Sequence, residues 1–321
     1  MEKGMRTLLS IKRALVTGGT GVTGNALVRY LLSQGIETIA LVRPNSSRLQ
    51  SLPENPLLTI IPCGLDDYPN RASKIKRPID VFFHLAWDGS LGKEKIDNRY
   101  NCYLQNKNVE YSLQAVDLCK ALECPVFVMT GSQGEYGHKD APIVEQMEKK
   151  PENAYGMAKL CAEQMTRLMC KKYGIKHIWP ILFSIYGPFD GANSLVDMTM
   201  KGLQRNQVIP YTKGEQMWDY LYSYDAARAL LLLAQRGGDG ESYNVAFGKP
   251  IRLSECINII YECYGYEKRP VLGEIPYAAN QLMRLEANID KLIRDTGFRP
   301  EYDFRSGILD IMSKQENYNG A

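Results

Sequence analysis

Thr17-Gly-Gly-Thr-Gly-Val-Thr-Gly24 joins an apolar segment, residues 11–17, to an amphipathic one. This order predicts a strand, a tight glycine turn and a helix. Gly18 permits the turn, Gly21 lets a pyrophosphate approach the backbone, and Gly24 lets the helix pack on the strand. Since a helix N-terminus carries partial positive charge, the loop predicts a dinucleotide site. Its expected contacts are Gly18, Thr20, Gly21, Val22 and Gly24.

The first half of the chain alternates short apolar runs with longer amphipathic segments. Strands that are apolar throughout are typical of a parallel sheet covered by helices on both faces. Right-handed crossovers make this a doubly wound α/β sheet, the Rossmann fold. The expected strands are 11–17, 38–42, 57–61, 79–86, 125–129 and 178–185, and the expected helices are 22–33, 100–122 and 155–173.

Beyond Gly187-Pro188 the elements become shorter and their order more mixed, which indicates a smaller α/β lobe that binds the substrate. The two expected lobes are each built from two separate stretches of the chain. Residues 1–187 and 218–250 are expected to form the cofactor lobe, and residues 188–217 and 251–321 the substrate lobe. The expected elements are helices 193–203, 225–235 and 254–264 and strands 219–222 and 242–246, with Asp225 and Ser254 as cap residues.

The composition excludes several classes of protein. The 321 residues include 39 Lys+Arg and 36 Asp+Glu, a net charge of +3, and 45% are hydrophobic. A chain this apolar and evenly charged is not disordered, and its charge does not indicate a nucleic-acid partner. No apolar run reaches the length of a membrane span, and no secretion signal precedes the first strand. We expect a cytoplasmic protein with no membrane contact.

The eight cysteines and three histidines show no spacing typical of a metal site, so no metal is expected. Many of the cysteines lie in apolar stretches. They are expected to be buried free thiols in a reducing compartment.

The loop after the second strand bears on the choice of cofactor. NAD sites usually carry an acid there that holds the ribose 2′-hydroxyl, whereas this chain reads Leu41-Val-Arg-Pro-Asn-Ser-Ser-Arg48. Arg43, Ser46, Ser47 and Arg48 instead suit the 2′-phosphate of NADP. A solvated basic loop is the alternative interpretation. We expect NADP(H), with NAD(H) as the second possibility.

Tyr155 and Lys159 stand four residues apart, so they share one face of a helix. That helix follows the strand 125–129, which continues into Ser132. Because the carboxyl ends of parallel strands face the ligand crevice, Ser132, Tyr155 and Lys159 are expected to meet there as a catalytic triad.

With these motifs the chain resembles the extended short-chain dehydrogenases/reductases, also called the NAD-dependent epimerase/dehydratase family. The likeness runs through nearly the whole chain. It rests on Gly18-Gly-Thr-Gly-Val-Thr-Gly24, His84-Leu-Ala86, Asn108-Val109, Ser132 four residues before Tyr136-Gly137, Tyr155 with Lys159, Tyr186-Gly-Pro188, Asp219-Tyr-Leu-Tyr-Ser-Tyr-Asp225, Tyr243-Asn-Val245 and Gly297-Phe-Arg-Pro300.

The resemblance implies an enzyme that modifies the sugar of a nucleotide sugar. Tyr155 then exchanges a proton with the reacting sugar oxygen and Ser132 orients that oxygen, while Lys159 holds the cofactor ribose and lowers the pKa of Tyr155. In relatives, the helices that match 100–122 and 155–172 pair between subunits, which implies a homodimer. The resemblance also adds to the cofactor contacts Leu65, Leu85 and Ala86.

Departures from the family pattern bear on the reaction. Members that catalyse 4,6-dehydration carry Asp-Glu after the catalytic serine or threonine, where this chain has Gln133-Gly134, so dehydration is not expected. The arginine that often clamps the substrate pyrophosphate is Trp218 here. Candidates to replace it are Arg284, Arg205 and Lys201. Gly64 stands where relatives have an acid near the adenine, and an Arg and an Asn of the family are replaced by Ile181 and Ser184.

Other candidates have plainer alternatives. Trp87 and Asp88 follow the fourth strand, where the indole can equally be packed in a loop. Asn193 begins a helix and can equally be its N-cap, and His84 is expected to be packed in its apolar strand. Glu135 either reaches the pocket or lies in solvent. The predicted substrate contacts are Trp87, Asp88, Gln133, Asn193, Trp218 and Arg284.

Three hypotheses of function follow. The first is NADPH-dependent reduction of a nucleotide-linked 4-keto-6-deoxy sugar, favoured by the basic loop and the missing dehydratase acids. The second is an NAD-retaining nucleotide-sugar 4-epimerase with the same triad. The third is a non-catalytic NADP-binding protein, against which the intact triad argues. The sugar and its nucleotide are left open.

Overall fold

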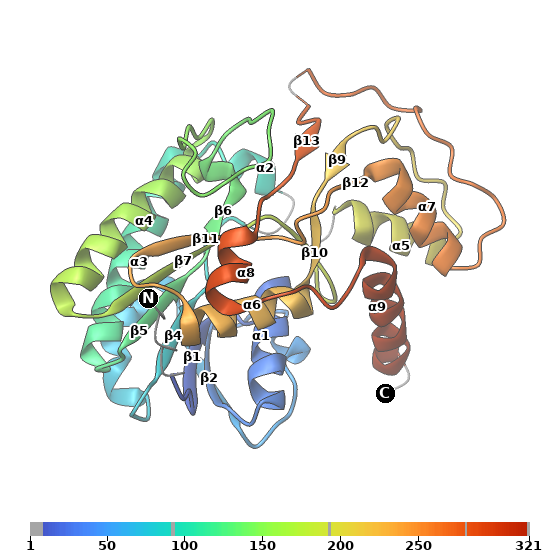
Figure 1. Cartoon of the computed structure of the whole chain (residues 1–321). Helices are drawn as coiled ribbons and strands as arrows, with labels where there is room; N and C mark the ends of the chain where they lie inside the picture. The colour runs from blue at the N-terminus through green and yellow to red at the C-terminus, as the bar shows by residue number, and fades with distance from the viewer. Residues whose placement is uncertain (1–8, 91–93, 192–193, 280, 320–321) are drawn as a thin grey trace.

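The computed structural model describes residues 9–90, 94–191, 194–279 and 281–319. Within these residues the main sheet has eight strands, in the order β3-β2-β1-β4-β5-β7-β11 with β6 paired to the end of β7 (Figure 1). All of its pairings are parallel. The strands are β1 (Arg13–Thr17), β2 (Glu37–Val42), β3 (Leu58–Pro62), β4 (Val81–His84), β5 (Val126–Met129), β6 (Gly131–Ser132), β7 (Lys176–Leu182) and β11 (Glu241–Val245).

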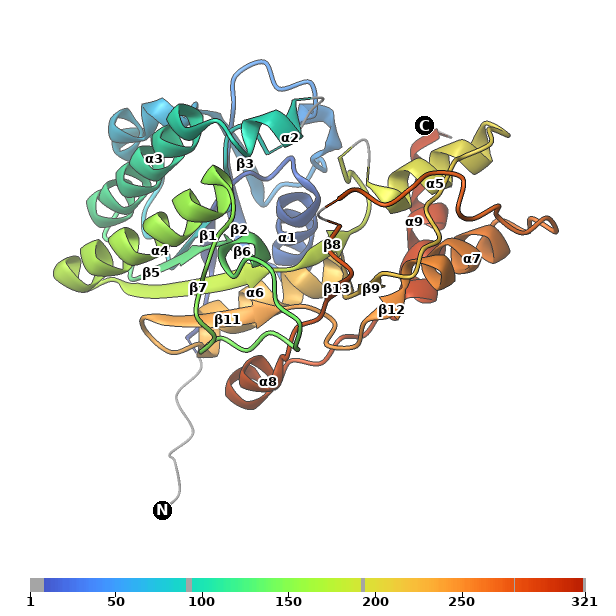
Figure 2. The same cartoon turned by 90° about the horizontal axis from the view of Figure 1, so that it is seen from above.

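This strand order confirms the doubly wound α/β sheet. The central strands β1, β4 and β5 are buried at nearly every residue, as expected for strands covered on both faces. On one face α1 (Val22–Ser33) packs against α6 (Ser223–Arg236), and on the other α3 (Cys102–Ala121) packs against α4 (Ala154–Tyr173) (Figure 2).

The connections of the sheet place a crevice at its centre. β1 lies between β2 and β4, so the chain leaves β1 toward one edge and later returns to build the other. The loops that follow β1 and β4 therefore diverge at the carboxyl ends of adjacent strands, which is where ligands bind in such sheets.

A second group of elements lies beside this sheet, on the right in Figure 1. It holds a three-stranded sheet in the order β12-β9-β13, a parallel pair β8–β10, and a separate apolar cluster. Its elements are β8 (Ser184–Tyr186), α5 (Leu195–Gln204), β9 (Met217–Trp218), β10 (Tyr220–Tyr222), β12 (Ile251–Arg252), α7 (Leu253–Cys263), β13 (Arg284–Leu285) and α9 (Phe304–Asn319). The helix α8 (Asp290–Thr296) falls within residues 251–321, the range that the sequence predicts for the substrate lobe. It packs instead against α6 and against β11 of the main sheet.

Several element boundaries differ from those predicted. α3 begins at Cys102 because the Asn101 side chain accepts the Leu104 N–H, and a short α2 (Lys95–Asn98) precedes it. The strand expected at 219–222 begins at Tyr220, since buried Asp219 accepts backbone N–H groups from two other loops. Ser254 caps nothing: α7 begins one residue before it.

The cysteines are all free thiols, but the expectation that they are buried is only partly right. Cys102 and Cys161 are exposed and Cys263 is half-buried. Among the described residues, no group of histidine, cysteine and acidic side chains is arranged to hold a metal ion. In the same part of the chain, no helix has both the length and the apolarity that crossing a membrane requires.

Asp225 joins the C-terminal segment to the first sheet. It was expected near the helix cap and lies in the first turn of α6, fully buried. Its carboxylate accepts the backbone N–H groups of Glu301 and Tyr302, each at 2.9 Å, and pairs with Arg228 at 2.6 Å. One carboxylate therefore accepts two backbone N–H groups of the C-terminal segment and pairs with Arg228, which also pairs with Glu301.

Replacing Asp225 by alanine is expected to lower the free energy of unfolding by roughly 3 kcal/mol, because two buried backbone N–H groups lose their acceptor and Arg228 loses one of its two carboxylate partners. Urea titration followed by circular dichroism measures this. Asp140→Ala is the control, since the Asp140 side chain is 95% exposed and pairs only with His138 at the surface. Equal stability of the two variants would show that Asp225 does not hold the segment.

Candidate active site

The glycine loop fits the roles predicted for each glycine. Gly18 has φ +72°, and a Cβ on it would lie 2.8 Å from the backbone N of Ala86 and the carbonyl C of Leu85. A Cβ on Gly24 would overlap the carbonyl oxygen of Gly18. Gly21 is different, because its Cβ would meet only the Gly18 oxygen at 3.5 Å, an ordinary contact. The fold itself therefore demands glycine at two of the three positions and leaves open space over the third.

The start of α1 is suited to an anion. Gly21 is its N-cap residue, no side chain caps the helix, and its first turn holds no acid. The first N–H groups of the helix therefore keep their capacity to bind a phosphate, and the positive end of the helix dipole adds to it. Thr20 and Val22 flank this point, both half-buried. These residues fit a dinucleotide pyrophosphate.

The residues of the basic loop after β2 lie in two different environments. Arg43 and Ser47 are exposed, and Ser46 is half-buried. Arg48 instead donates a hydrogen bond to the carbonyl of Phe189, in the chain that leads to α5. Arg43 and the two serines thus stay at the surface of the loop after β2, while Arg48 reaches toward the second group of elements.

The structure brings the predicted triad together. Ser132 ends β6, and Tyr155 and Lys159 lie in the first two turns of α4. The Ser132 hydroxyl lies close enough to the Tyr155 phenol to lower its pKa. The Lys159 Nζ donates to the Thr130 carbonyl at 2.9 Å and lies 3.8 Å from the centroid of a Trp87 ring.

Burial controls the protonation of this triad. It raises the pKa of the Tyr155 phenol, while the Ser132 hydroxyl and the positive charge of Arg99 act in the opposite direction. Burial also lowers the pKa of Lys159 to about 7. The family resemblance implies that Lys159 lowers the pKa of Tyr155, whereas the positive charge that lowers this pKa in the structure is that of Arg99, whose guanidinium carbon lies 5.6 Å from the Tyr155 ring centroid.

Trp87 and its neighbours form a wall of the triad. The indole is buried, donates to Gln105 at 2.8 Å and meets the Tyr155 ring edge-on at 6.0 Å. Its packed position agrees with the plainer of the two predictions made for it. Asp88 is exposed. Its backbone N–H donates to the side-chain oxygen of Asn108, and its carbonyl accepts a hydrogen bond from the Asn108 amide nitrogen.

The other predicted contacts differ in position. Gln133 is half-buried and lies directly after Ser132. Leu65 opens a 3₁₀ turn after Gly64, and Leu85 and Ala86 follow β4 against the glycine loop. His84 is buried, hydrogen-bonded to Thr17 at 2.8 Å, with a pKa that burial lowers to about 3, which confirms a packed residue. Asn193 lies outside the described residues, and Ser194 caps α5.

Two departures from the family pattern contact one another. The Trp218 indole donates to the Ser184 hydroxyl at 2.6 Å, so the residues that stand for an Arg and an Asn form a pair. Of the candidates to replace the arginine, Arg284 lies on β13, next to the strand of Trp218, and is bound to Glu286. Lys201 pairs with Asp197.

Sequence reasoning missed the charged groups around the triad. Arg99 comes from an irregular segment and accepts the Tyr155 N–H on its carbonyl at 3.0 Å. Glu135, predicted either in the pocket or in solvent, is in neither place: it is fully buried and paired with Lys149. The sequence does contain a signal for Glu163: it continues the four-residue spacing of Tyr155 and Lys159, which predicts that it lies on the same face of α4.

Taken together, the geometry can bind a dinucleotide along α1 and exchange a proton at Tyr155. The phenol, a neighbouring hydroxyl and a buried amine converge at the carboxyl ends of the strands, where a carbonyl or hydroxyl substrate would lie between Tyr155 and the cofactor.

Comparisons with known proteins agree with this geometry. A curated relative is CDP-abequose synthase of Salmonella muenchen, 24% identical over 308 residues that cover 95% of this chain and 98% of that protein. The solved UDP-glucose 4-epimerase of Thermotoga maritima has a TM-score of 0.84 at 22% identity, covering 96% of this chain and 99% of that one. The dTDP-glucose 4,6-dehydratase of Bacillus anthracis, solved with NAD, has a TM-score of 0.81 at 20% identity, covering 97% and 98%.

The family model described as the NAD dependent epimerase/dehydratase family matches residues 14–246, which include the glycine loop and the whole triad. The chain belongs to the NAD-dependent epimerase/dehydratase family of enzymes.

Proposed function

We propose that this enzyme uses NADPH to reduce a nucleotide-linked 4-keto-6-deoxy sugar. The observation that carries the proposal is the chemistry beside the catalytic serine. Gln133 and Gly134 hold the positions where acids would drive elimination of water, and Gly134 faces the Tyr155 ring, since its Cβ would lie 3.8 Å away. The acid that follows, Glu135, is held by Lys149 and Trp179. Reduction needs no such acid.

The protonation of Tyr155 supports the reductive direction. Reduction of a ketone requires a proton donor for the forming alkoxide, and burial keeps the phenol protonated by raising its pKa. The Ser132 hydroxyl lowers the pKa of that phenol from nearby, so we expect it to bind the same sugar oxygen. A nicotinamide cofactor bound along α1 would supply the hydride. Lys159 would hold its ribose.

We infer a nucleotide-sugar substrate for this chain from the names of its relatives. One is named CDP-abequose synthase, and the solved Thermotoga enzyme contains UDP-glucose. Trp218 and Ser184 replace two polar residues of the family pattern, so we propose that the diphosphate is bound differently here, with Arg284 as the candidate cation.

Tyr155→Phe should lower kcat for reduction about 10²- to 10⁴-fold, because the alkoxide loses its proton donor. The assay follows NADPH absorbance with a panel of nucleotide-linked 4-keto-6-deoxy sugars. Tyr173→Phe on the same helix is the control, since Tyr173 contacts Asp117 far from the triad. Unchanged turnover by Tyr155→Phe on a confirmed substrate would contradict the mechanism.

Arg43→Ala should weaken NADPH binding about tenfold and leave NADH binding unchanged, because only NADPH carries the phosphate that the guanidinium would meet. Fluorescence titration of both cofactors measures the ratio. Lys12→Ala is the control for a lost exposed cation. Equal losses for NADPH and NADH would reject the 2′-phosphate role of Arg43.

A nucleotide-sugar 4-epimerase that retains NAD is the second candidate, and the likeness to the Thermotoga 4-epimerase favours it. The two functions differ in what the purified protein contains. Tightly bound NAD, together with failure to oxidise NADPH with any keto sugar, would favour the epimerase over the reductase.

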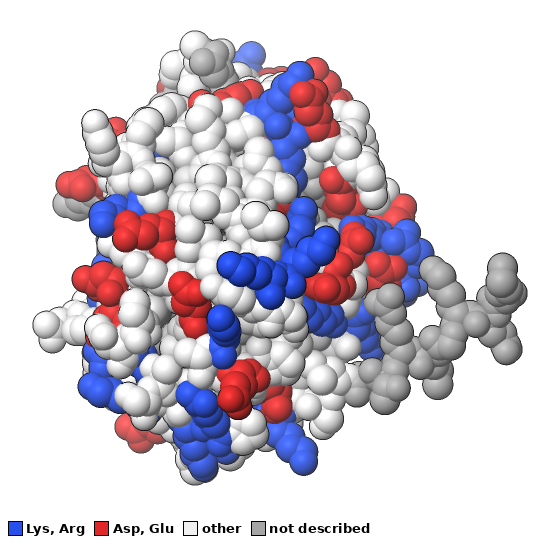
Figure 3. Space-filling model, turned by 90° about the vertical axis from the view of Figure 1, so that its left-hand side faces the viewer, with Lys and Arg blue, Asp and Glu red and all other residues white. Residues whose placement is uncertain are grey.

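We also propose a homodimer formed through α3 and α4. Figure 3 looks onto this side of the molecule and shows a broad uncharged area across it. Exposed apolar side chains contribute to it from both helices: Tyr103 is 89%, Leu168 71%, Met157 55% and Met165 42% exposed. Apolar surface of this extent is typical of an interface.

Leu168→Glu should convert the dimer into a monomer, because a carboxylate would be buried at the interface without a partner. Light scattering at micromolar concentration measures the mass. Val208→Glu is the matched control, since Val208 is 85% exposed and follows α5, away from these helices. A monomeric wild type would overturn the dimer proposal.

A further inference from the structure

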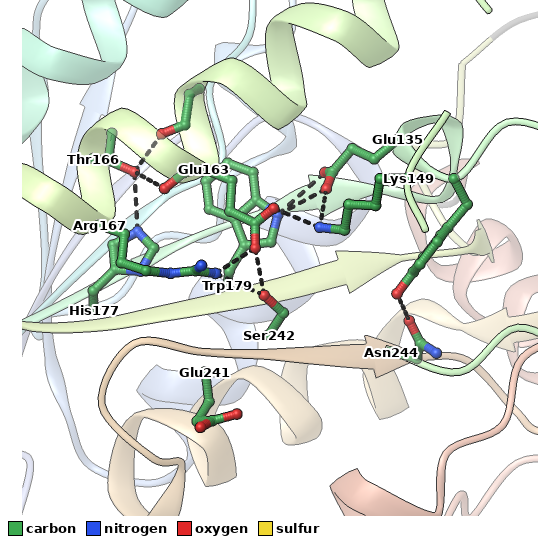
Figure 4. Close-up of polar contacts among 12 residues, drawn as sticks. Glu135, Lys149, Glu163, Thr166, Arg167, His177, Trp179, Glu241, Ser242 and Asn244 are labelled. Carbon is green, nitrogen blue, oxygen red and sulfur yellow. Dashed lines mark hydrogen bonds and ion pairs between the residues drawn. The ribbon is translucent and has the colours of Figure 1, made fainter. Parts of the chain in front are cut away.

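A buried carboxylate lies directly behind the catalytic serine. Glu135 has no exposed surface, and its Oε1 accepts the Ser132 backbone N–H at 2.8 Å. The same oxygen accepts the Trp179 indole N–H at 3.1 Å (Figure 4). Its Oε2 accepts a hydrogen bond from the Lys149 Nζ at 2.7 Å. Glu135 thus closes a single 3₁₀ turn, in which the Ser132 hydroxyl accepts the N–H of Gly134.

The same lysine joins this turn to the catalytic helix. Lys149 also pairs with Glu163, which is 2% exposed and in turn binds Arg167 and Ser242 (Figure 4). Glu163 lies one turn after Lys159 on the inward face of α4. The two carboxylates and the lysine therefore connect the backbone of Ser132 to the helix that carries the tyrosine and the lysine of the triad.

Burying these charges has a cost that packing alone would avoid. An apolar residue at position 135 would fill the space beside Trp179 without desolvating a carboxylate, and such replacements of buried ion pairs are often neutral or stabilising. It would, however, leave the Ser132 N–H without its acceptor and free the turn from α4. The charged side chains therefore add to packing a fixed position for the backbone of Ser132.

We propose that Glu135 is a positioning residue of the active site: it fixes the backbone of Ser132, while Lys149 and Glu163 lock it to the helix that carries Tyr155 and Lys159. The role rests on the proposed function, in which Ser132 orients the reacting oxygen. Glu135 touches neither substrate nor cofactor and acts through its neighbours.

Its negative charge has a second effect, on Lys159. Burial lowers the pKa of Lys159 to about 7, and the carboxylate of Glu135 raises it against that effect. The other groups that face Lys159 are the Thr130 carbonyl, the Trp87 ring, the Tyr155 ring and His84, which burial keeps neutral at physiological pH. The carboxylate of Glu135 therefore helps Lys159 to remain an ammonium. Burial raises the pKa of Glu135 itself, and of the two charged groups that face it Lys149 lowers that pKa and Glu163 raises it.

Glu135→Gln keeps the shape of the side chain and removes its charge. Because the serine is held less well, kcat should fall about 10- to 100-fold with KM for NADPH changed less than about twofold. A function of protonated Lys159 is present below its pKa and lost above it, so the falling limb of the kcat–pH profile should move to lower pH by roughly one unit. Glu241→Gln is the control, since Glu241 pairs with Lys291 and lies apart from the network in Figure 4.

If Glu135→Gln had the kcat of the wild type and a kcat–pH profile whose falling limb lay at the wild-type pH, the proposal would be overturned. Lys149→Gln provides a second test should the first variant fail to fold. It leaves Glu135 beside Glu163 without its cation, which favours the protonated carboxyl, so the limb should again move to lower pH.

A titration without substrate separates this inference from the proposed function. With lysine labelled with ¹³C at Cε, and the Lys159 signal assigned by Lys159→Ala, the pKa of Lys159 should be lower in Glu135→Gln than in wild type. An unchanged value would reject the charge effect whatever the substrate is. If that pKa shifts but no keto sugar is reduced, the failure belongs to the proposed function and not to the link between Glu135 and the triad.

Discussion

The backbone of the glycine loop lies against the backbone that follows β4, and the placement of the site depends on this contact. Only a residue without a Cβ fits at Gly18, so the end of β1 approaches Leu85 and Ala86 directly. Trp87 comes next in the chain, and its indole is thereby set against Lys159. A single close approach thus places the dinucleotide loop and the wall of the triad in one crevice.

The parts of the site that follow from regular structure could be predicted from the sequence. The glycine loop lies between a strand and a helix, and Tyr155 and Lys159 have helical spacing, so pattern and position agree. The parallel, doubly wound sheet could be predicted from apolar strands that alternate with helices. Element ends were less predictable, because capping by Asn101 and the buried bonds of Asp219 are decided by tertiary contacts.

The charged surroundings of the triad could not be predicted for a related reason. Arg99 and Lys149 belong to irregular segments, whose paths no periodic pattern defines. Glu135 lies in a loop after a strand, where a carboxylate is usually solvated, and only the folded structure shows the lysine that permits its burial. Likewise, Trp218 and Ser184 were two separate departures in the sequence, and their hydrogen bond makes them one joint change.

The helix α4 presents a different surface on each side. Its inward residues include Tyr155, Lys159 and Glu163, and its outward residues include exposed Met157 and Leu168. A substitution on either of these sides changes the predicted triad or the apolar surface, which leaves exposed polar positions of α4, such as Gln164 and Lys171, as its more tolerant ones. Laboratory evolution toward new sugars would find more neutral steps in the loops around β9 and β13 than in the helix that carries Tyr155 and Lys159.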